Sequence, residues 1–509
     1  MTGISRDLTA AAGQSYDLII VGGGIYGAML SLEASRQGLK SLLLEREDFG
    51  SATSLNSLRI IHGGFRYLQN LDIRRFFESV RERRWFLQHF PHLVKPLPCL
   101  MPLYGRGART PAVLSAALSL NDWLSSHRND GVSPDNHLPP GSVISAQQVK
   151  QYFPSVQTEG LKGGAIWYDA GLDDPQRLLV GLLRRSCALG GVALNYVEAR
   201  TLLKTKNSVA GVCATDCIGS ESYEYRAPIV VNAAGPWCRE VAAAFDRDIS
   251  ALFNPSLAWN VLFDREAPST FTLAIAPNHP NARTYILRSW KGKLLAGTVH
   301  SPWSQPVEYC PKPSEAEVLA FIKALNATAP DLDLRPSQIQ RIYAGFLPIE
   351  QGKGIKLSKR EIVWNHEQHH GPTGLYSVSG VKFTTSHWVA EKTLATIFPD
   401  RKLSAKGFPI GETTEDMRGA DVRGVFACDW NPGDAMEWQM RLRQIADEES
   451  VQHLDDLVFR RTSLGDTLKI GRTGIEAISR IFNWDDCVRD RELHRFSQEA
   501  KRLHYRSSQ

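Results

Sequence analysis

The sequence has no run of the roughly 20 consecutive apolar residues that a membrane-spanning helix needs. Residues 1–15 also lack the charged and then apolar order of a secretory signal peptide. The eight cysteines are scattered without a C-x-x-C pair, so the sequence predicts neither a zinc site nor a disulfide framework, and we expect no bound metal. We therefore expect a cytoplasmic protein with reduced thiols.

Strong net charge is also absent. A formal charge of +5 is small for 509 residues; it argues against a nucleic-acid binder but allows weak attraction to anionic lipids or substrates. Residues 71–90 have a helical pattern in which five arginines alternate with apolar side chains. A surface helix with a packed apolar stripe explains this pattern. The alternative is a helix lying on the inner face of a membrane, which would make the protein a peripheral membrane protein.

The N-terminal segment has the order of a dinucleotide-binding βαβ unit. It consists of an apolar run, a glycine motif, a helical pattern and a second buried strand at residues 16–21, Gly22-x-Gly24-x-x-Gly27, 25–36 and 40–44. The glycines permit a tight turn, close approach to a pyrophosphate and close helix packing, and the helix N-terminus supplies N–H groups to the phosphates. Glu45 ends the second strand, where its carboxylate can accept ribose hydroxyls.

Three later segments favour FAD over a nicotinamide dinucleotide, because FAD needs a longer cradle. They are SATS at residues 51–54, VNAAGPW at 231–237 and SGVKFTT at 379–385. The third precedes a helix that Thr384 or Thr385 would cap, with its positive end toward the flavin edge that gains charge on reduction. Lys382 would add a full charge there, unless it is a solvated surface lysine.

Motifs along the whole chain resemble those of the FAD-dependent aerobic glycerol-3-phosphate dehydrogenase family. In the family's order they are GGGIYG, LLEREDFGSATS, SLRIIHGGFRYLQ, GAIWYDAGLDD, VNAAGPW, LLAGTV, SGVKFTT and LVFRRTSLGD. The stretch IHGGFRYL is the most diagnostic, because flavoproteins of the neighbouring amine-oxidase group do not usually carry it. The resemblance implies FAD as the cofactor and dehydrogenase or oxidase activity.

The resemblance and the predicted elements together indicate an α/β fold of three parts. A Rossmann-like FAD-binding domain of the glutathione-reductase type is expected at residues 16–90, 155–250 and 340–400. An antiparallel-sheet substrate or cap domain is expected at 91–154 and 251–339, because strand-like runs separated by turn residues recur there. A C-terminal helical domain is expected at 405–509.

The resemblance also implies roles for individual residues. His62, Arg66, Tyr67 and Lys382 would be catalytic, and Gly63 and Gly64 would let the backbone approach the flat flavin ring. For His62 a packed, hydrogen-bonded histidine is the alternative, and for Arg66 a structural salt bridge. The expected cofactor contacts are Gly22, Gly24, Ile25, Gly27, Glu45, Arg46, Ala52, Thr53, Ser54, Arg59, Ile61, Gly63, Gly64, Val197, Ala233, Gly235, Trp237, Pro348, Lys382, Phe383 and Thr384.

Substrate-side positions depart from the family's pattern. Leu347 stands where the family usually has an arginine that grips the substrate phosphate, and His387 where it tends to have another arginine. Trp259 or Asn260 replaces a histidine near the reacting hydroxyl. We therefore expect Trp259, Asn260, Leu347 and His387 to line a changed substrate pocket. An apolar wall of Leu347 and Trp259 would exclude a phosphate, whereas two converging cations would restore one.

The implied reaction is the oxidation of a CH–OH group of a small polyol or hydroxy acid, with or without a phosphate. A base takes the hydroxyl proton while hydride moves to flavin N5, and a quinone, oxygen or another acceptor then reoxidises the flavin. Two alternatives stay open. One is an amine or amino-acid oxidase of the related flavoprotein group, and the other is a flavin-bearing membrane-surface or assembly protein with little turnover.

Overall fold

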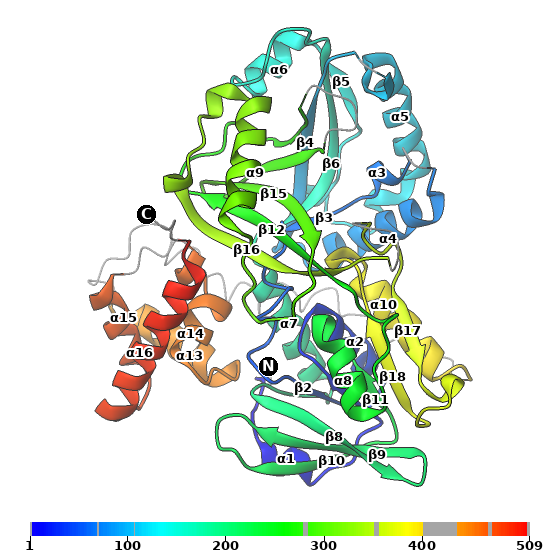
Figure 1. The fold of residues 1–509 in the computed structure, drawn as a ribbon, viewed down its shortest axis with the longest axis vertical. Helices are drawn as coiled ribbons and strands as arrows, with labels where there is room; N and C mark the ends of the chain where they lie inside the picture. The colour runs from blue at the N-terminus through cyan, green and yellow to red at the C-terminus, as the bar shows by residue number, and fades with distance from the viewer. Residues whose placement is uncertain are drawn as a thin grey trace.

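The computed structural model describes residues 3–68, 71–105, 107–277, 283–350, 356–400, 435–466 and 471–505. A mainly parallel sheet forms the lower half of the molecule in Figure 1 and a larger, mainly antiparallel sheet forms the upper half. Helices near the C-terminus form a third part at one side. This arrangement confirms the expected α/β class with a C-terminal helical region.

The lower sheet has six strands in the order β17-β18-β11-β1-β2-β7, and all its neighbours pair in parallel except β17. The strands are β1 (Leu18–Val21), β2 (Ser41–Leu44), β7 (Val192–Leu194), β11 (Val230–Asn232), β17 (Ile362–Asn365) and β18 (Leu375–Ser379). Both faces of the central strands are covered, so every residue of β1 and β2 is buried. This explains why the sequence shows continuous apolar runs there.

Different elements cover the two faces of this sheet. Leu18 and Ile20 of β1 pack among helices α2 (Ile25–Arg36), α7 (Pro175–Ala188) and α10 (Ser386–Ile397). Ile19 and Val21 point the other way, because side chains alternate along a strand. They pack toward α1 (Leu8–Ala12), α8 (Cys238–Phe245) and a three-stranded sheet of β8 (Val197–Thr205), β9 (Ser208–Asp216) and β10 (Ser222–Arg226).

The upper sheet runs in the order β16-β12-β15-β14-β13-β4-β6-β3, with β5 paired to β6. Its strands are β3 (Ile60–Ile61), β4 (Val94–Leu103), β5 (Ser142–Ile144), β6 (Gly163–Leu172), β12 (Pro255–Phe263), β13 (Thr272–Ile275), β14 (Tyr285–Trp290), β15 (Lys293–Pro302) and β16 (Ile339–Pro348). Strands β3, β6 and β16 come from segments that the sequence assigned to the FAD domain. The chain therefore passes between the two sheets more often than expected.

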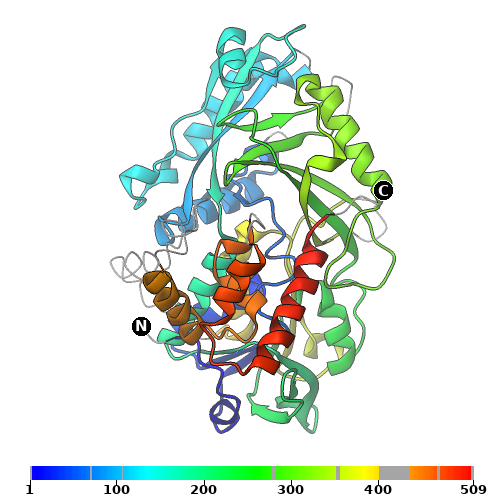
Figure 2. The ribbon, with the colours of Figure 1, turned by 90° about the vertical axis from the view of Figure 1, so that its left-hand side faces the viewer.

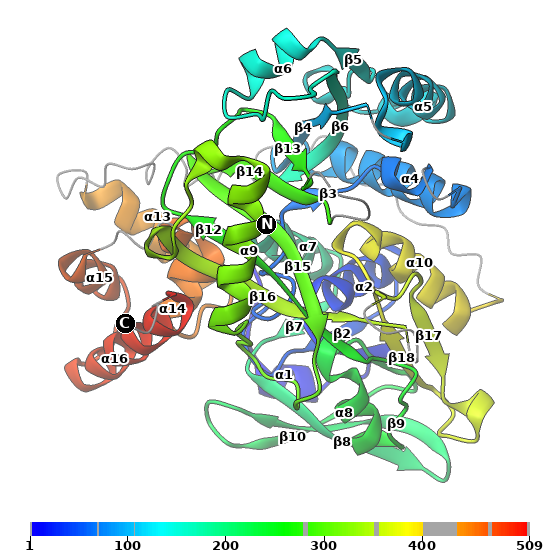
Figure 3. The ribbon, with the colours of Figure 1, turned by 45° about the horizontal axis from the view of Figure 1, so that its top comes forward.

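Further helices surround the upper sheet and reach the lower one. They are α3 (Phe65–Leu68), α4 (Ile73–His89), α5 (Pro111–Leu124), α6 (Ala146–Tyr152) and α9 (Glu315–Thr328). Figure 3 shows α4 above α10 and α2, at the junction of the two halves. Its Arg81 pairs with Glu391, and the buried Arg83 lies 3.6 Å from Asp169. These contacts support the packed surface helix, although Phe77 is exposed.

The C-terminal helices pack around their own apolar cluster, which includes Leu442, Leu457 and Phe459. They are α13 (Ala435–Glu448), α14 (Leu454–Asp456), a π-helical turn (Leu457–Arg461), α15 (Arg472–Ser479) and α16 (Asp486–Leu503). We call this part the C-terminal module; residues 405–434 of the expected domain lie outside the described residues. Figure 2 shows the module in front of the junction of the two halves. No helix of the described residues is both long and apolar enough to cross a bilayer.

Trp259 provides a test of the upper core. It is fully buried on β12 and meets Phe321 of α9 edge to face, with ring centroids 5.2 Å apart. We expect Trp259→Ala to lower the free energy of unfolding by about 3–5 kcal/mol, because it leaves a large cavity. Urea denaturation followed by circular dichroism measures this loss. Trp123→Ala, at a side chain on α5 that is 72% exposed, should change stability by about 0.5 kcal/mol or less. Equal losses in both variants would contradict this account of the core.

Candidate functional site

A cavity of about 450 Å³ extends from the lower sheet to the upper one. It starts at the carboxyl ends of β1, β2 and β11, where ligands bind in open parallel sheets. The turn between β1 and α2, the loop after β2 and the loop after β11 form its walls there. Its other end lies against β12, β16 and residues 380–384, which precede α10.

The glycine motif shapes the first part of this cavity. Gly22 has φ +109°, and a Cβ at Gly27 would lie 1.8 Å from the Gly22 carbonyl oxygen. Gly27 therefore faces the strand and lets α2 pack against it, whereas Gly22 and Gly24 line the cavity. The N–H of Ile25 donates to Ser54 Oγ at 2.9 Å. The N-terminus of α2 and a hydroxyl thus lie side by side, as a pyrophosphate requires.

The loop after β2 forms the end of the cavity next to the glycine motif. The carboxylate of Glu45 accepts hydrogen bonds from Gly23 N at 2.6 Å and Glu47 N at 2.9 Å. Each oxygen keeps acceptor capacity for a ribose hydroxyl. Burial raises the pKa of Glu45 above its ordinary value. Arg46 stacks on Trp237, with its guanidinium carbon 4.5 Å from the ring centroid, and both side chains line the cavity.

The segment from Gly380 to Thr384 joins the two halves of the cavity. The Tyr26 hydroxyl donates to Lys382 O at 2.6 Å and accepts from Lys382 N at 2.8 Å. A Cβ at Gly380 would lie 1.8 Å from the Tyr26 ring, so the position requires glycine. Thr384 does not cap α10; its hydroxyl accepts from the backbone N–H of His62 at 3.1 Å. Lys382, Phe383 and Thr384 all line the cavity.

His62 lies at the far end of the cavity beside a buried carboxylate. Its Nδ1 is 3.4 Å from Asp169 Oδ2, and the other oxygen of Asp169 accepts from Gly63 N at 2.7 Å. Burial raises the pKa of Asp169, but the hydrogen bond from His62 and the charge of Arg83 outweigh it and leave the pKa below its ordinary value. Asp169 is therefore ionised and orients the imidazole.

Lys382 lines the same cavity as His62. Burial and the nearby charge of Arg66 lower the pKa of Lys382 to about 8. Its ammonium contacts the Tyr67 hydroxyl and lies 4.1 Å from the centre of that ring. Burial, Arg283 and Arg66 likewise lower the pKa of His300. Arg66 thus influences both Lys382 and His300, although its exposed side chain does not line the cavity.

Several residues expected at the cofactor have other positions. Arg59 is buried in the upper core with its guanidinium 4.1 Å from the Trp290 ring and 4.2 Å from the Tyr343 ring. A Cβ at Gly63 would lie 1.9 Å from Arg83, and one at Gly64 would lie 3.0 Å from Ser79. These glycines therefore make room for α4 and not for a flat ring. The buried Ile61 and Pro348 do not line the cavity either.

Two of the four expected substrate residues also lie elsewhere. Trp259 points into the core between β12 and α9. His387 is buried between α2, α4 and α10, stacks on Trp85 and lies 3.3 Å from Glu82. Glu82 also accepts from Trp388 N at 2.9 Å, so its carboxylate already binds the first turn of α10. Part of the positive helix end predicted for the flavin is satisfied within the protein.

Asn260 and Leu347 remain at the cavity wall, as do Ala52, Thr53, Val197, Ala233 and Gly235. Asn260 Oδ1 accepts from the hydroxyl of Thr298, which also lines the cavity, at 2.9 Å. Thr298 lies in the motif LLAGTV and Asp169 in GAIWYDAGLDD, so the sequence contained a signal for both residues, although neither was among the expected site residues. Tyr309 lines the cavity without any such signal.

Comparison with known proteins identifies the group to which this site belongs. A family model described as FAD dependent oxidoreductase matches residues 17–395. The chain belongs to the FAD-dependent oxidoreductase family. A glycerol-3-phosphate dehydrogenase from Synechocystis is 30% identical over 434 residues, which cover 82% of this chain and 76% of that protein. The expected resemblance to that group and the expected cofactor, FAD, are both confirmed.

Solved structures share the fold of this oxidoreductase. The structure of the glycerol-3-phosphate dehydrogenase from Bacillus halodurans complexed with FAD has a TM-score of 0.71 and 20% identity, covering 97% of this chain and 96% of that one. A glycine oxidase from Bacillus cereus has a TM-score of 0.54 and 14% identity, covering 76% of this chain and 96% of that one. The fold similarity to the first extends over the C-terminal module.

The polar groups along the cavity are arranged in the order that FAD requires. Glu45 can receive a ribose, the N-terminus of α2 a pyrophosphate, and the space between Lys382 and Leu347 a ring system. A tryptophan at Gly24 would occupy the pyrophosphate's place.

We expect Gly24→Trp to give colourless protein without bound flavin, as measured by the absorbance ratio at 450 and 280 nm. Gly13→Trp places the same side chain at an exposed position with φ −75° after α1, and it should keep the yellow colour. Full flavin content in the Gly24 variant would contradict the assignment of this cavity.

Proposed function

We propose that this FAD-dependent oxidoreductase oxidises the secondary alcohol of a small anionic polyol, with glycerol 3-phosphate as the first candidate. The observation that carries the proposal is that Lys382 and His62 both line the cavity with Thr384, whose hydroxyl accepts from His62 N, and that the charge of Arg66 acts on Lys382 from outside the lining. The name of the Synechocystis relative supports the choice of substrate. The anionic group would bind the cations and the alcohol would face His62.

His62 is the proposed base. Because Nδ1 faces the ionised Asp169, the favoured tautomer carries its proton on Nδ1 and leaves Nε2 as an acceptor. Nε2 can then take the hydroxyl proton of the substrate. Asp169 would stabilise the imidazolium that results, in the way a carboxylate supports a catalytic histidine. When bound, FAD would accept the hydride from the carbon that carries this hydroxyl group.

Strands β12 and β15 contribute polar side chains to the wall of the cavity. Thr298 and Asn260 form a hydrogen-bonded pair that can orient a second hydroxyl of the substrate. Leu347 lines the same region without a charge, so the phosphate would depend on Lys382 and Arg66. Each hydrogen bond to a charged group contributes about 1.5–3 kcal/mol. Without a further arginine in place of Leu347, we therefore expect the phosphate to bind more weakly than it would in a site that has one.

A separate molecule would accept the electrons afterwards, and a quinone or oxygen are the proposed acceptors. The exposed Ile73 and Phe77 of α4, beside Arg74, form a surface suited to contact with an anionic membrane that holds such a quinone. Peripheral attachment at the inner face of a membrane is therefore part of the proposal.

Anaerobic reduction of the bound flavin tests the substrate class. Glycerol 3-phosphate should bleach the absorbance near 450 nm, and glycerol at the same concentration should bleach it far more slowly, because only the phosphate binds the cations. Amino acids and primary amines serve as the comparison for an amine oxidase. Bleaching by amines alone would overturn the proposal in favour of that alternative, and no bleaching by any of these compounds would favour the protein with little turnover.

The pH dependence tests Lys382. Its pKa of about 8 means that it is charged below this pH and loses its charge as the pH rises through it. We expect KM for glycerol 3-phosphate to rise above pH 8, by up to about tenfold per pH unit. Lys382→Arg should remove this rise, because arginine stays protonated. KM for uncharged glycerol provides the control and should not rise with pH in this range. A wild-type KM that is constant from pH 7 to 10 would exclude the proposed role.

A further inference from the structure

Among the contacts of the C-terminal module with the rest of the molecule are two that involve buried carboxylates. Glu449, which follows α13, accepts hydrogen bonds from Arg177 and Arg184 of α7, at 2.6 to 2.8 Å. The π-helical turn of the module reaches Asp48, in the loop after β2. Asp48 and Glu449 are both almost completely buried. The first contact attaches the module to a helix, whereas the second attaches it to a loop of the FAD cavity.

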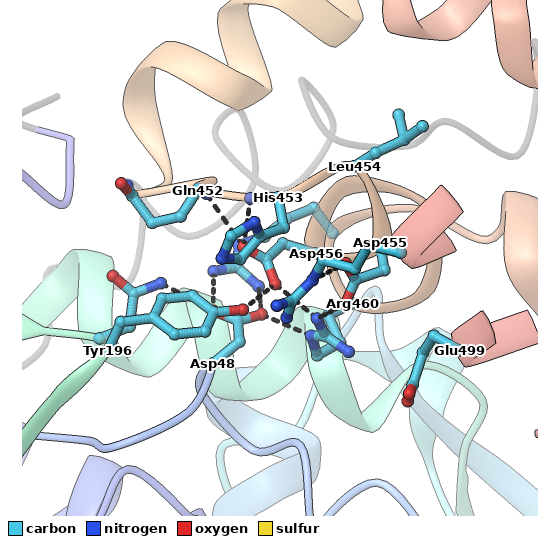
Figure 4. A network of polar contacts seen from close by, with 12 residues as sticks. Asp48, Tyr196, Gln452, His453, Leu454, Asp455, Asp456, Arg460 and Glu499 are labelled. Atoms are coloured by element: carbon cyan, nitrogen blue, oxygen red, sulfur yellow. Dashed lines mark hydrogen bonds and ion pairs between the residues drawn. The ribbon is translucent and has the colours of Figure 1, made fainter. Parts of the chain in front are cut away.

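Asp48 is held on several sides (Figure 4). It accepts from Arg460 Nε at 2.7 Å and from two nitrogens of Arg461 at 2.7 Å each, and Asn195 donates to it at 2.9 Å. Burial raises the pKa of Asp48, but the charges of Arg461 and Arg460 outweigh it and hold the pKa well below the usual range. The carboxylate is therefore ionised and strongly bound.

The arginines are themselves fixed within the module. Arg460 also donates to Asp455 at 2.6 Å and to Asp456 at 2.5 Å, and the hydroxyl of Tyr196 donates to Asp456 at 2.6 Å (Figure 4). Such a network keeps one geometry, because loss of any member leaves a buried charge without its partner. The module thus presents a rigid pair of guanidinium groups to Asp48.

Asp48 lies within the loop that lines the FAD cavity, so this network also holds that loop. Its neighbours Arg46, Glu47, Gly50 and Ser51 line the FAD cavity, while Asp48 faces away from it toward the module. Glu45, whose carboxylate faces the proposed ribose position, begins the same loop. A loop of this length cannot move at Asp48 without moving the residues on either side that line the cavity.

A second contact from the module supports another wall of the cavity. Tyr309 lines the cavity together with Ser51 of the loop after β2. Arg502 of α16 lies over this ring, with its guanidinium carbon 4.8 Å from the centroid. Tyr309 therefore lies between the cavity and the module.

We propose that the C-terminal module retains FAD: its Arg460, Arg461 and Arg502 are positioning residues that hold the Glu45–Ser51 loop and Tyr309 against the cofactor without contacting it. The proposal rests on the binding of FAD and not on the identity of the substrate. It predicts that breaking these contacts speeds the release of FAD, whereas breaking other ion pairs of the module does not.

Two matched pairs of variants of the full-length holoenzyme test this prediction. Asp48→Asn and Glu449→Gln each neutralise a buried carboxylate that binds two arginines at the module interface, but only Asp48 lies in the cavity loop. Arg502→Gln and Arg489→Gln each remove an arginine of α16 that pairs with an acid three residues earlier, but only Arg502 contacts Tyr309. Arg502 is partly exposed, so its variant keeps the fold even where Asp48→Asn fails to.

The readout is the rate of FAD release after dilution of the holoenzyme, followed by the fluorescence of free flavin. We expect release to be at least about tenfold faster in Asp48→Asn than in Glu449→Gln, and about threefold to tenfold faster in Arg502→Gln than in Arg489→Gln. Turnover at saturating FAD should stay near that of the wild type in Arg502→Gln. Equal release rates within the Arg502 and Arg489 pair would overturn the role of Arg502 and Tyr309, and equal rates within both pairs would show that the module only stabilises the fold.

Discussion

The double hydrogen bond between the Tyr26 hydroxyl and the backbone of Lys382 fixes where the two ends of the cavity meet. Tyr26 belongs to α2, whose N-terminus faces the pyrophosphate position, and Lys382 precedes α10. Thr384 continues the connection by accepting from His62 N, next to β3 of the upper sheet. Through these contacts the cofactor-binding turn, the proposed catalytic base and the proposed anion site keep one relative position, although they are far apart in the sequence.

Buried carboxylates then determine which groups carry charge around the cavity. Asp169 and Asp48 stay ionised because arginines and hydrogen-bond donors outweigh the cost of burial, whereas Glu45 has backbone donors and its pKa is raised by burial. Lys382 shows the opposite balance, since burial and Arg66 both lower its pKa. The site therefore has an acceptor end near Glu45 and a basic residue, Lys382, at the other end, on which the proposed binding of an anionic substrate depends.

The glycine motif and Glu45 were predictable from the sequence because their function depends on local geometry. A turn, a strand end and a helix start are encoded within a few residues, so Gly22, Gly24 and Glu45 lie at the cavity as expected. Trp259 and His387 show the limit of this reasoning. Both positions depart from the family's pattern and were therefore expected in the substrate pocket. Strand alternation turns Trp259 into the core, and His387 of α10 is buried against α2 and α4.

The sequence by itself determined the family, the cofactor and the α/β class with a helical C-terminal part, because these follow from local motifs and their order. Only the tertiary structure decided which side chains meet. Asp169 pairs with His62, and Asp48 pairs with Arg460 and Arg461, across many residues of chain. Such pairs depend on how the two sheets and the C-terminal module pack together, and no periodicity or spacing in the sequence records that packing.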